Sequence, residues 1–361
     1  MTTERQVDVL VVGAGPAGLA AAARLAAAGA GLVEVLEREP EAGGVPRYCV
    51  HGGFGTWTRP LTGPAYAGLL VEAAARAGAV VRTGVTVLDW AGTPSGSGEV
   101  RCGSAAPRRG AGNCATSHDG AAVDTRHIAV LPAERLGLAT VGVRGPETVT
   151  ARAVVLATGA YERPRTARLI PGTRPAGVYT GGELQQAVHR YRQPIGGRAV
   201  VVGAEDVSYA AAETVRAAGA EVVAMLTDRP RAAVVRAVTD VTRAASVRAL
   251  DAQLRSRVPL LTGTTVTEIL GHGRLSGVRI RHLDGRTGVL SCDTVVFTGD
   301  FVAEDELARR ARITLAHGPG TDRPGVFAVG GLPHPGRDAR TAAREGVLAA
   351  GAVLEWLLSR P

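Results

Sequence analysis

The chain has 361 residues, which is long for one domain and sufficient for two domains that each bury a core. Hydrophobic residues make up 45% and aromatic residues 4%, a composition typical of an α/β protein rich in Ala, Val, Leu and Gly. The formal net charge is +8, but every basic residue is an arginine and the arginines are scattered among acids. Such a charge forms no continuous phosphate track, so we expect no nucleic-acid binding.

The cysteines and the N-terminus exclude further classes. Cys49, Cys102, Cys114 and Cys292 form no CxxC pair and no zinc-ligand spacing. Cys102 and Cys114 with His118 could be imagined as a metal site, but they lie in a Gly/Ser/Arg-rich stretch, so we expect reduced thiols and no metal. The N-terminus does not resemble a signal peptide and no apolar run is long enough to cross a bilayer. We therefore expect a soluble, cytoplasmic protein without membrane contacts.

The first pattern along the chain is a βαβ unit. Residues 7–12 form an apolar, β-branched run, a Gly-rich turn and a helical stretch follow, and a second apolar run at 32–36 ends in an acid. In the GxGxxG turn, Gly13 permits the tight turn, Gly15 lets the backbone approach a pyrophosphate, and Gly18 allows close packing of helix on strand. The helix N-terminus offers free N–H groups and a favourable dipole to phosphates.

An acid completes this unit. Glu37 stands at the tip of the second strand, about 20 residues after the turn, where it can accept hydrogen bonds from ribose hydroxyls. The unit therefore predicts a dinucleotide site. The motif alone does not separate FAD from NAD.

The rest of the first half contains a helix, several strands and an irregular stretch. The helix is predicted at 66–78 and the strands at 80–90, 127–131, 139–143 and 153–157. Gly, Ser, Pro, Arg and Asn dominate residues 92–120, which we interpret as a surface insertion between strands of a β-meander. The strand at 153–157 ends in Thr158 and Gly159.

The pattern repeats about 190 residues later. A strand and turn at 198–203, a helix at 209–218 and a strand at 221–226 form a second βαβ unit, which indicates an internal duplication. Residues 294–299 echo the earlier strand that ends in Thr-Gly. A buried strand at 325–331 precedes a helix that runs to Leu358.

Three stretches carry a resemblance to a known family. They are GGVPRYCVHGGFG at 43–55, ATGAYERPRTARLIPGTRPAGVYTGGELQQ at 157–186 and VVVGAEDVSYAAAETVRAAGAEV at 200–222. With GVFAVGG at 325–331, they make the chain resemble, over essentially its full length, the FAD-dependent oxidoreductases with two dinucleotide-binding domains, the pyridine nucleotide-disulfide oxidoreductase-like superfamily. The resemblance is closer still to the flavoprotein subunits of hydrogen cyanide synthase, opine oxidase and hydroxyproline dehydrogenase.

The resemblance implies an α/β fold with two Rossmann-like domains. An FAD domain with a β-meander would comprise 1–163 and 300–361, and an NAD(P)-type domain would be inserted at 164–299. The residues implied to hold FAD lie in the first turn, at the tip of the second strand, in the loop that follows it and beside the later strands. They are Gly13, Ala14, Gly15, Pro16, Ala17, Gly18, Glu37, Arg38, Gly44, Val45, Val87, Ala157, Thr158, Gly159, Gly330 and Gly331.

The C-terminal motif departs from the family pattern. Gly331 stands where the family usually has Asp or Asn, which removes a side chain expected to bond the ribityl-phosphate region, although the backbone N–H could still serve. Residues 340–346 would aim a helix N-terminus at the flavin pyrimidine and stabilise the anionic reduced ring.

The second nucleotide site departs further. Its turn keeps Gly203, but Glu205 and Ser208 replace the second and third glycines, and a carboxylate is unfavourable where a pyrophosphate must approach. Asp228 comes late for the ribose acid, and the arginines after it could at best mimic a 2′-phosphate clamp. Three interpretations stay open: a degenerate structural domain, a surface for another ligand or partner, and NAD(P)H binding through an altered turn.

The chemistry at the flavin is less specified. The paired cysteines of disulfide reductases are absent from the sequence, so we do not expect that activity. In the loop implied to run beside the isoalloxazine, Arg47 could hold a substrate carboxylate and His51 could remove a proton from an amine. Equally, Arg47 could bind an FAD phosphate and His51 could cap a turn. His334 is a second candidate base or a loop histidine, and residues 161–163 are expected to form an interdomain hinge contact.

Three functions follow. The favoured one is an FAD-dependent oxidoreductase that oxidises a small amine, amino acid or hydroxy acid. The cysteine-rich extension of larger relatives is missing from this sequence, so electrons would pass to oxygen, to a separate iron–sulfur partner or to another oxidoreductase. The alternatives are an NAD(P)H-dependent flavin reductase and a non-catalytic flavin-binding subunit of a multi-subunit dehydrogenase.

Overall fold

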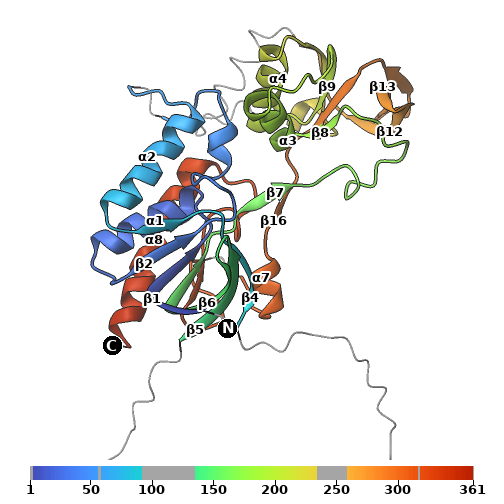
Figure 1. Cartoon of the computed structure of the whole chain (residues 1–361). Coiled ribbons are helices and arrows are strands. Elements are labelled where there is room, and N and C mark those ends of the chain that lie inside the picture. Colours follow the sequence, from blue (N-terminus) through green and yellow to red (C-terminus); the bar gives the residue numbers. More distant parts are fainter. Residues whose placement is uncertain (1–2, 56–57, 92–134, 234–257, 316–317, 361) are drawn as a thin grey trace, which may run out of the picture.

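The computed structural model describes residues 3–55, 58–91, 135–233, 258–315 and 318–360. It has two α/β bodies joined by two adjacent strands (Figure 1), and it confirms the predicted α/β class with two Rossmann-like domains. Within the described ranges, no helix combines the length and apolar character that a membrane crossing requires. The predicted insertion at 92–120, with Cys102, Cys114 and His118, and the predicted strand at 127–131 lie outside the described residues.

The first domain is built on a seven-stranded sheet in the order β3-β2-β1-β6-β5-β4, with β17 also paired to β6. Its strands are β1 (Thr3–Val12), β2 (Val33–Leu36), β3 (Val80–Arg82), β4 (Thr86–Trp90), β5 (Leu136–Gly142), β6 (Gly145–Leu156) and β17 (Val326–Ala328). The strands β1, β2, β3, β6 and β17 are parallel. The strands β4, β5 and β6 pair antiparallel, as the predicted meander requires.

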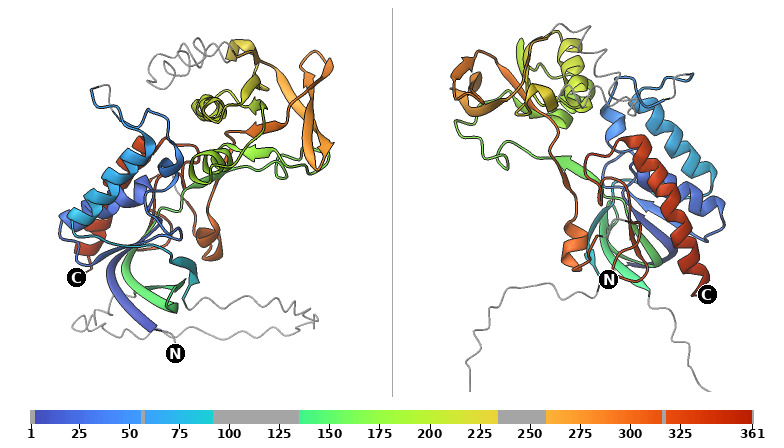
Figure 2. Two further views of the ribbon diagram at one scale, coloured as in Figure 1. Left: turned by 45° about the horizontal axis from the view of Figure 1, so that its top comes forward. Right: turned by 180° about the vertical axis from the view of Figure 1, so that it is seen from behind.

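Helices cover one face of this sheet (Figure 2). They are α1 (Pro16–Ala27), α2 (Gly63–Arg76) and α8 (Ala339–Leu358). Val9 and Val11 of β1 point into the cluster beneath these helices, and Leu10 points into a second cluster on the opposite face. All three are fully buried, which explains why β1 is a continuous apolar run rather than an alternating one. The opposite face is closed by α7 (Glu306–Arg310), whose Leu307 carbonyl accepts a 2.8 Å hydrogen bond from the Trp90 indole.

The second domain has a five-stranded parallel sheet and a separate three-stranded antiparallel sheet. The parallel sheet has the order β11 (Leu260–Leu261), β10 (Glu221–Leu226), β9 (Arg198–Val202), β15 (Thr294–Phe297) and β8 (Val178–Thr180). The antiparallel sheet contains β12 (Thr264–His272), β13 (Arg274–His282) and β14 (Thr287–Leu290). The helical segments of the second domain include α3 (Gly181–Gln185), the π-helical η2 (Gln186–Arg190) and α4 (Asp206–Ala217).

Two short strands connect the domains (Figure 1). The outgoing β7 (Ala160–Glu162) pairs antiparallel with the returning β16 (Phe301–Ala303). Glu162 lies at this connection, and its carboxylate accepts hydrogen bonds from the backbone N–H groups of Gly182 at 2.7 Å and Gly299 at 3.2 Å. Burial raises the pKa of Glu162, although these hydrogen bonds oppose the rise. The predicted divisions at 163/164 and 299/300 cut the chain beside these strands.

Two sequence predictions of strands were incomplete, and one sheet was not predicted. The single strand predicted at 80–90 is split at Gly84, whose φ of +67° ends β3 and allows β4 to pair with β5 instead of continuing beside β2. The strand predicted at 153–157 begins already at Gly145, because its first half is a meander strand with alternating burial. The sheet β12-β13-β14 was not predicted, since exposed polar residues interrupt its apolar positions.

Candidate active site

In the turn after β1, two of the three motif glycines lie against neighbouring backbone atoms and the third faces open space. A Cβ atom on Gly13 would lie 2.4 Å from the Ala157 carbonyl oxygen. A Cβ on Gly18 would lie 2.0 Å from the Gly13 carbonyl oxygen. A Cβ on Gly15, in contrast, would meet nothing within 4 Å. The protein itself therefore requires glycine at the first and third positions, whereas the space at Gly15 is available to a ligand.

This open point is also the start of α1. Gly15 is the N-cap of the helix and Pro16 follows as the first helical residue, so no side chain caps the first N–H groups. Gly44, with a φ of +65°, crosses the turn so closely that its Cβ would lie 2.8 Å from the Gly15 Cα. Uncapped N–H groups and the positive end of the helix dipole suit a pyrophosphate.

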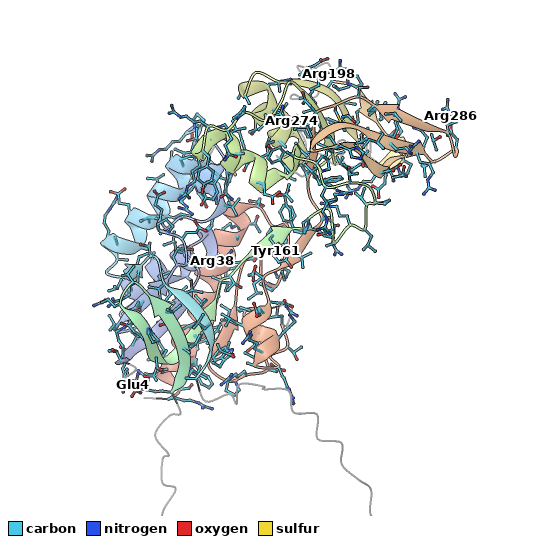
Figure 3. The ribbon with its side chains drawn as sticks, turned by 45° about the vertical axis from the view of Figure 1, so that its right-hand side comes forward. Glu4, Arg38, Tyr161, Arg198, Arg274 and Arg286 are labelled. Carbon is cyan, nitrogen blue, oxygen red and sulfur yellow. The ribbon has the colours of Figure 1, made fainter. Side chains whose placement is uncertain are left out.

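Glu37 lies beside this turn at the carboxyl end of β2. Its side chain is 8% exposed. One carboxylate oxygen accepts a hydrogen bond from the Ala14 N–H and the other accepts one from the Glu39 N–H, both at 2.9 Å. Each oxygen keeps a further lone pair, so Glu37 can still accept from ribose hydroxyls. The neighbouring Arg38 is exposed (Figure 3).

Four further predicted cofactor residues converge from the carboxyl ends of β6 and β17: Thr158, Gly159, Gly330 and Gly331. A Cβ on Gly331 would lie 3.4 Å from Gly159, and one on Gly330 would lie 2.6 Å from the Ala17 Cβ at the start of α1. A Cβ on Gly159 would meet nothing within 4 Å. The Thr158 hydroxyl is committed, since it donates to the Glu304 carbonyl at 2.7 Å.

Three other predicted cofactor residues have different settings. Ala157 is buried in the core beneath α1, and Val45 is 59% exposed in the 3-10 helix η1 (Val45–Tyr48). Val87 is partly buried on the sheet face opposite α1. Val87 therefore lies on the side of the sheet away from α1 and its open turn.

The two predicted catalytic residues have partners within their own loop. The Arg47 guanidinium donates to the Tyr48 hydroxyl at 2.7 Å and to the Glu41 carboxylate at 3.3 Å. His51 Nδ1 lies 2.8 Å from the Gly52 carbonyl oxygen, and its ring centroid lies 5.4 Å from that of Phe54. These contacts fit a loop that His51 helps to fix. A carbonyl can only accept, so Nδ1 carries the proton and Nε2 is the nitrogen able to take one.

The described cysteines are poor nucleophiles. Cys49 is 8% exposed, and its Sγ lies 3.1 Å from Gln185 Oε1. Burial raises the pKa of the Cys49 thiol to about 12, and burial together with the charge of Asp293 raises that of Cys292 to about 11. Thiolate chemistry at neutral pH is therefore disfavoured at both residues.

The second domain packs against the candidate reaction loop through groups that the sequence did not single out. The guanidinium groups of Arg47 and Arg190 lie 4.8 and 5.7 Å from the centroid of the Tyr48 ring, and Arg190 donates to the Tyr48 hydroxyl at 3.0 Å. Burial and the nearby charge of His51 lower the pKa of His189 on η2. These contacts join residues far apart in the chain, so no local signal indicates them.

The turn of the second domain is filled by its own side chains. Ser208 Oγ and Thr298 Oγ1 lie 2.7 Å apart, and a Cβ on Gly203 would lie 2.4 and 2.1 Å from them. The Glu205 carboxylate forms a 3.1 Å ion pair with Arg229 and lies 3.0 Å from where a Cβ on Gly299 would stand. The position that is open in the first turn is thus occupied by an anionic side chain in the second.

His334 lies near a carboxylate, but its buried Nδ1 and the buried Oε2 of Glu345 make no hydrogen bond within the described residues. Its Nδ1 lies 3.5 Å from Glu345 Oε2, and the other oxygen of Glu345 lies 3.4 Å from Arg337. Over the part of the chain that the structure describes, no group of three or more His, Cys, Asp or Glu side chains could hold a metal ion.

Comparisons with solved structures show a likeness of fold. The thioredoxin reductase of T. acidophilum aligns with a TM-score of 0.69 and 19% identity, covering 97% of this chain and 98% of that one. A bacillithiol disulfide reductase from Bacillus cereus aligns with a TM-score of 0.67 and 18% identity, covering 99% and 100%. The L-proline dehydrogenase of P. horikoshii aligns with a TM-score of 0.58 and 14% identity, covering 98% of this chain and 56% of that one. At these identities the likeness is one of fold.

Sequence comparisons identify the family. The sarcosine oxidase subunit alpha of Rhizobium meliloti (strain 1021) is 27% identical over 153 residues, which are 42% of this chain and only 13% of that subunit. The profile of the pyridine nucleotide-disulphide oxidoreductases matches residues 7–346. The chain therefore belongs to the pyridine nucleotide-disulphide oxidoreductase family and is an FAD-dependent oxidoreductase.

Proposed function

We propose that this protein takes a hydride from a small amine, amino acid or hydroxy acid and that NAD(P)H is not its reductant. The observation that carries this proposal is the contrast between the two turns. The first is open at Gly15, whereas the second is filled by the Glu205 carboxylate and its ion pair with Arg229. The local likeness to a sarcosine oxidase subunit supports a small amine as the class of donor.

The FAD would be held by the first domain. The N–H groups at the start of α1 would bind the pyrophosphate, and Glu37 would accept from the ribose. When bound, FAD supplies the acceptor for the substrate's hydride. The start of α8, where Asp338 caps the helix, would place the positive end of a helix dipole toward the flavin pyrimidine.

The residues of the loop at 43–55 would manage the substrate and its proton. His51 would accept the proton at Nε2, because Nδ1 is engaged by the Gly52 carbonyl. His189 would stay neutral beside it, since its lowered pKa disfavours a second positive charge. Arg47 would hold the loop through Tyr48 and Glu41 rather than bind the substrate.

A specific observation also favours the NAD(P)H-dependent reductase as a second candidate. The unit β9-α4-β10 keeps the complete parallel topology, and Gly203 keeps a φ of +139° at the first position of its turn. If the Glu205 side chain were displaced, Arg229 would be left without this partner beside a possible phosphate site. The deciding question is therefore whether Glu205 excludes the nucleotide.

Nucleotide binding to the holoprotein answers this question. NADPH and NADH are titrated calorimetrically into wild type, Glu205→Ala and Glu213→Ala, the last a matched loss of one exposed carboxylate on α4. We expect undetectable or weak binding by wild type and Glu213→Ala, and binding at least about tenfold tighter by Glu205→Ala, a difference of about 1.4 kcal/mol. Tight binding of either nucleotide by wild type would contradict the proposal and favour the second candidate.

A further inference from the structure

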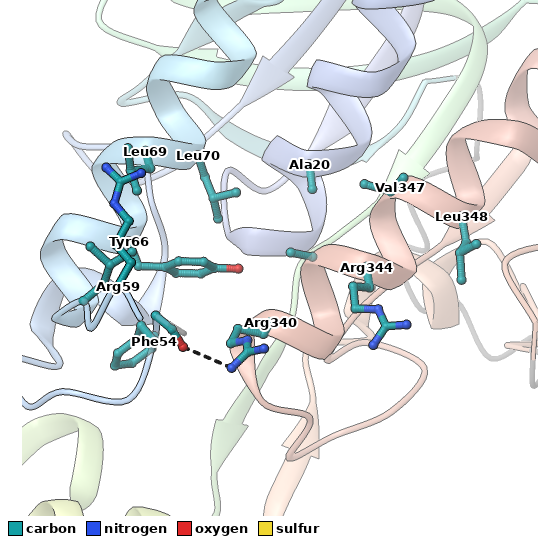
Figure 4. Close-up of a pocket in the computed structure, with 13 residues that line it drawn as sticks. Ala20, Phe54, Arg59, Tyr66, Leu69, Leu70, Arg340, Arg344, Val347 and Leu348 are labelled. Atoms are coloured by element: carbon teal, nitrogen blue, oxygen red, sulfur yellow. Dashed lines mark hydrogen bonds between the residues drawn. The ribbon is translucent and has the colours of Figure 1, made fainter. Parts of the chain in front are cut away.

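The loop that carries His51 is held by both domains. On the first-domain side, the Phe54 ring centroid lies 5.4 Å from that of His51 and 5.9 Å from that of Tyr66 on α2. The next residue is fixed as well, because Arg340 of α8 donates to the Gly55 carbonyl at 3.1 Å (Figure 4). On the other side, α3 and η2 of the second domain contact η1 of the loop. His51 therefore lies between a first-domain anchor and a second-domain anchor.

Two side-chain contacts hold the second domain on this loop. The buried Gln185 of α3 has its Oε1 3.1 Å from Cys49 Sγ. Further along the same helical segment, Arg190 of η2 donates to the Tyr48 hydroxyl at 3.0 Å. Tyr48 and Cys49 come shortly before His51 in the chain, so both contacts bring the second domain onto the segment that leads into His51.

The π-helical turn of η2 brings His189 to the same side. The Tyr191 N–H donates to the Gln186 carbonyl at 3.0 Å, which is the i to i+5 bond of a π-helix. In an α-helix, Arg190 would lie about 140° round the axis from Gln185. The wider turn reduces this angle, so that both side chains contact the loop. His189 is the residue before Arg190 and therefore lies on the same face. Such turns are rare and occur frequently at functional sites.

His189 keeps its hydrogen-bonding capacity at this contact. It is half-buried, and its ring nitrogens make no hydrogen bond to any described residue. Burial and the charge of His51 lower the pKa of His189, so the imidazole is neutral near neutral pH and offers one acceptor nitrogen. His51 offers a second acceptor at Nε2, because its Nδ1 is engaged by the Gly52 carbonyl.

The arginines of this contact are compensated by carboxylates. Arg190 lies 3.7 Å from Glu39, and Arg47 lies 3.3 Å from Glu41. Neither arginine is therefore left as an uncompensated cation that a carboxylate would seek. The two imidazoles, in contrast, offer acceptors to a cation that carries N–H groups.

We propose that the ammonium group of the donor binds between the two domains, where it donates to His51 Nε2 and to a ring nitrogen of His189. The second domain, whose own nucleotide turn is filled, then serves to complete the donor site. This assignment rests on the proposed function and narrows the donor to amines and amino acids. An ammonium group has three N–H groups for the two acceptors, whereas a hydroxy acid brings one O–H group and a carboxylate.

Binding without turnover tests this site. The cationic probe is tert-butylamine, which has no hydrogen on its α carbon and cannot be oxidised to an imine, and the anionic probe is pivalate, a carboxylate of the same shape. Each is titrated calorimetrically into the holoprotein at neutral pH. The variants are His189→Ala, His189→Gln, which keeps a hydrogen-bond acceptor, and the matched control His272→Ala, an exposed histidine on β12 of the same domain.

We expect wild type and His272→Ala to bind tert-butylamine with affinities within about twofold of each other. His189→Ala should bind it at least about tenfold more weakly, a difference of about 1.4 kcal/mol, and His189→Gln should lose less. Pivalate should bind to wild type at least about tenfold more weakly than tert-butylamine does.

Three results would overturn the proposal. Wild type could fail to bind tert-butylamine or bind pivalate as tightly, or His189→Ala could bind the amine as wild type does. A weaker affinity in both His189 variants, together with lower thermal stability than His272→Ala, would assign a structural role to His189 and also overturn it. These titrations involve no reductant. Bleaching of the flavin by NADPH, with amine binding that still depends on His189, would refute the proposed function alone.

Discussion

Replacing Gly15 by alanine should strongly weaken FAD binding while leaving the fold intact. Gly15 has φ −81° and ψ −177°, an extended conformation open to any residue, and its Cβ would meet no atom within 4 Å. Alanine restricts the unfolded chain, a gain of about 0.4–1 kcal/mol, but it is a poorer N-cap than glycine by up to about 1 kcal/mol. The free energy of unfolding of the apoprotein should therefore change by less than about 1 kcal/mol.

The same methyl group would occupy the space that a pyrophosphate needs. We expect FAD affinity to fall by roughly 100-fold or more, which corresponds to about 2.7 kcal/mol. Gly18→Ala provides the contrast, since its Cβ would lie 2.0 Å from the Gly13 carbonyl oxygen and 3.2 Å from the Ala157 Cβ. Backbone atoms must move to relieve this contact, so Gly18→Ala should destabilise the apoprotein by about 1–3 kcal/mol.

Two measurements separate these effects. Urea unfolding of the apoproteins gives the free energy of unfolding, and titration of FAD into each apoprotein gives its affinity. Wild-type FAD affinity in Gly15→Ala would refute the assignment of the open space to the cofactor. A loss of apoprotein stability equal to that of Gly18→Ala would show that Gly15 has a structural role instead.

The remaining predictions concern three other sites. Arg5→Met removes one of two arginine partners from Glu34, which is 2% exposed, and should lower the free energy of unfolding in urea by about 2–3 kcal/mol; a loss below about 0.5 kcal/mol would contradict this. Asp338→Ala removes the α8 cap and should cost about 1 kcal/mol near neutral pH. Burial alone would raise the pKa of Asp338, but hydrogen bonds from Thr341 and the helix backbone outweigh it and lower that pKa. The stability that Asp338 contributes is therefore fully present above the ordinary carboxyl pKa of 3.8 and is lost as the pH falls through the lower pKa of the folded state. Thermal unfolding of both proteins across acidic pH should show the difference closing. Cys49, whose thiol pKa is raised to about 12, should react with a disulfide reagent at least about 100-fold more slowly in the native holoprotein than after denaturation, and equal rates would contradict its burial.

The first βαβ unit could be predicted because its information is local. An apolar run, three glycines and Glu37 at the next strand tip define strand, turn, helix and acid without reference to the rest of the chain. The split at Gly84 could not be predicted, because it depends on which neighbour each half-strand finds in the sheet. The sheet β12-β13-β14 was missed for a related reason, since its cross-strand pairs, not its own periodicity, stabilise it.

For the candidate site, the sequence predicts which residues take part but not which groups they contact. The sequence nominates Arg47 and His51, but whether Arg47 faces a ligand or Tyr48 is decided by the packing of η1 against the second domain. The sequence also indicates that Glu205, a carboxylate at a glycine position of the motif, is unfavourable for pyrophosphate binding. That it lies over Gly299 and pairs with Arg229 depends on segments distant in the chain, so only the folded structure indicates how the turn is filled.

The central claim is that an organic donor, not a nicotinamide nucleotide, reduces the flavin. The direct measurement is an anaerobic titration of the purified holoprotein with NADPH and NADH, followed by small amines, amino acids and hydroxy acids, with flavin absorbance recorded near about 450 nm. We predict that neither nucleotide bleaches the flavin and that a member of the organic set does. Rapid bleaching by NADPH or NADH would contradict the claim and identify the protein as a nucleotide-dependent reductase.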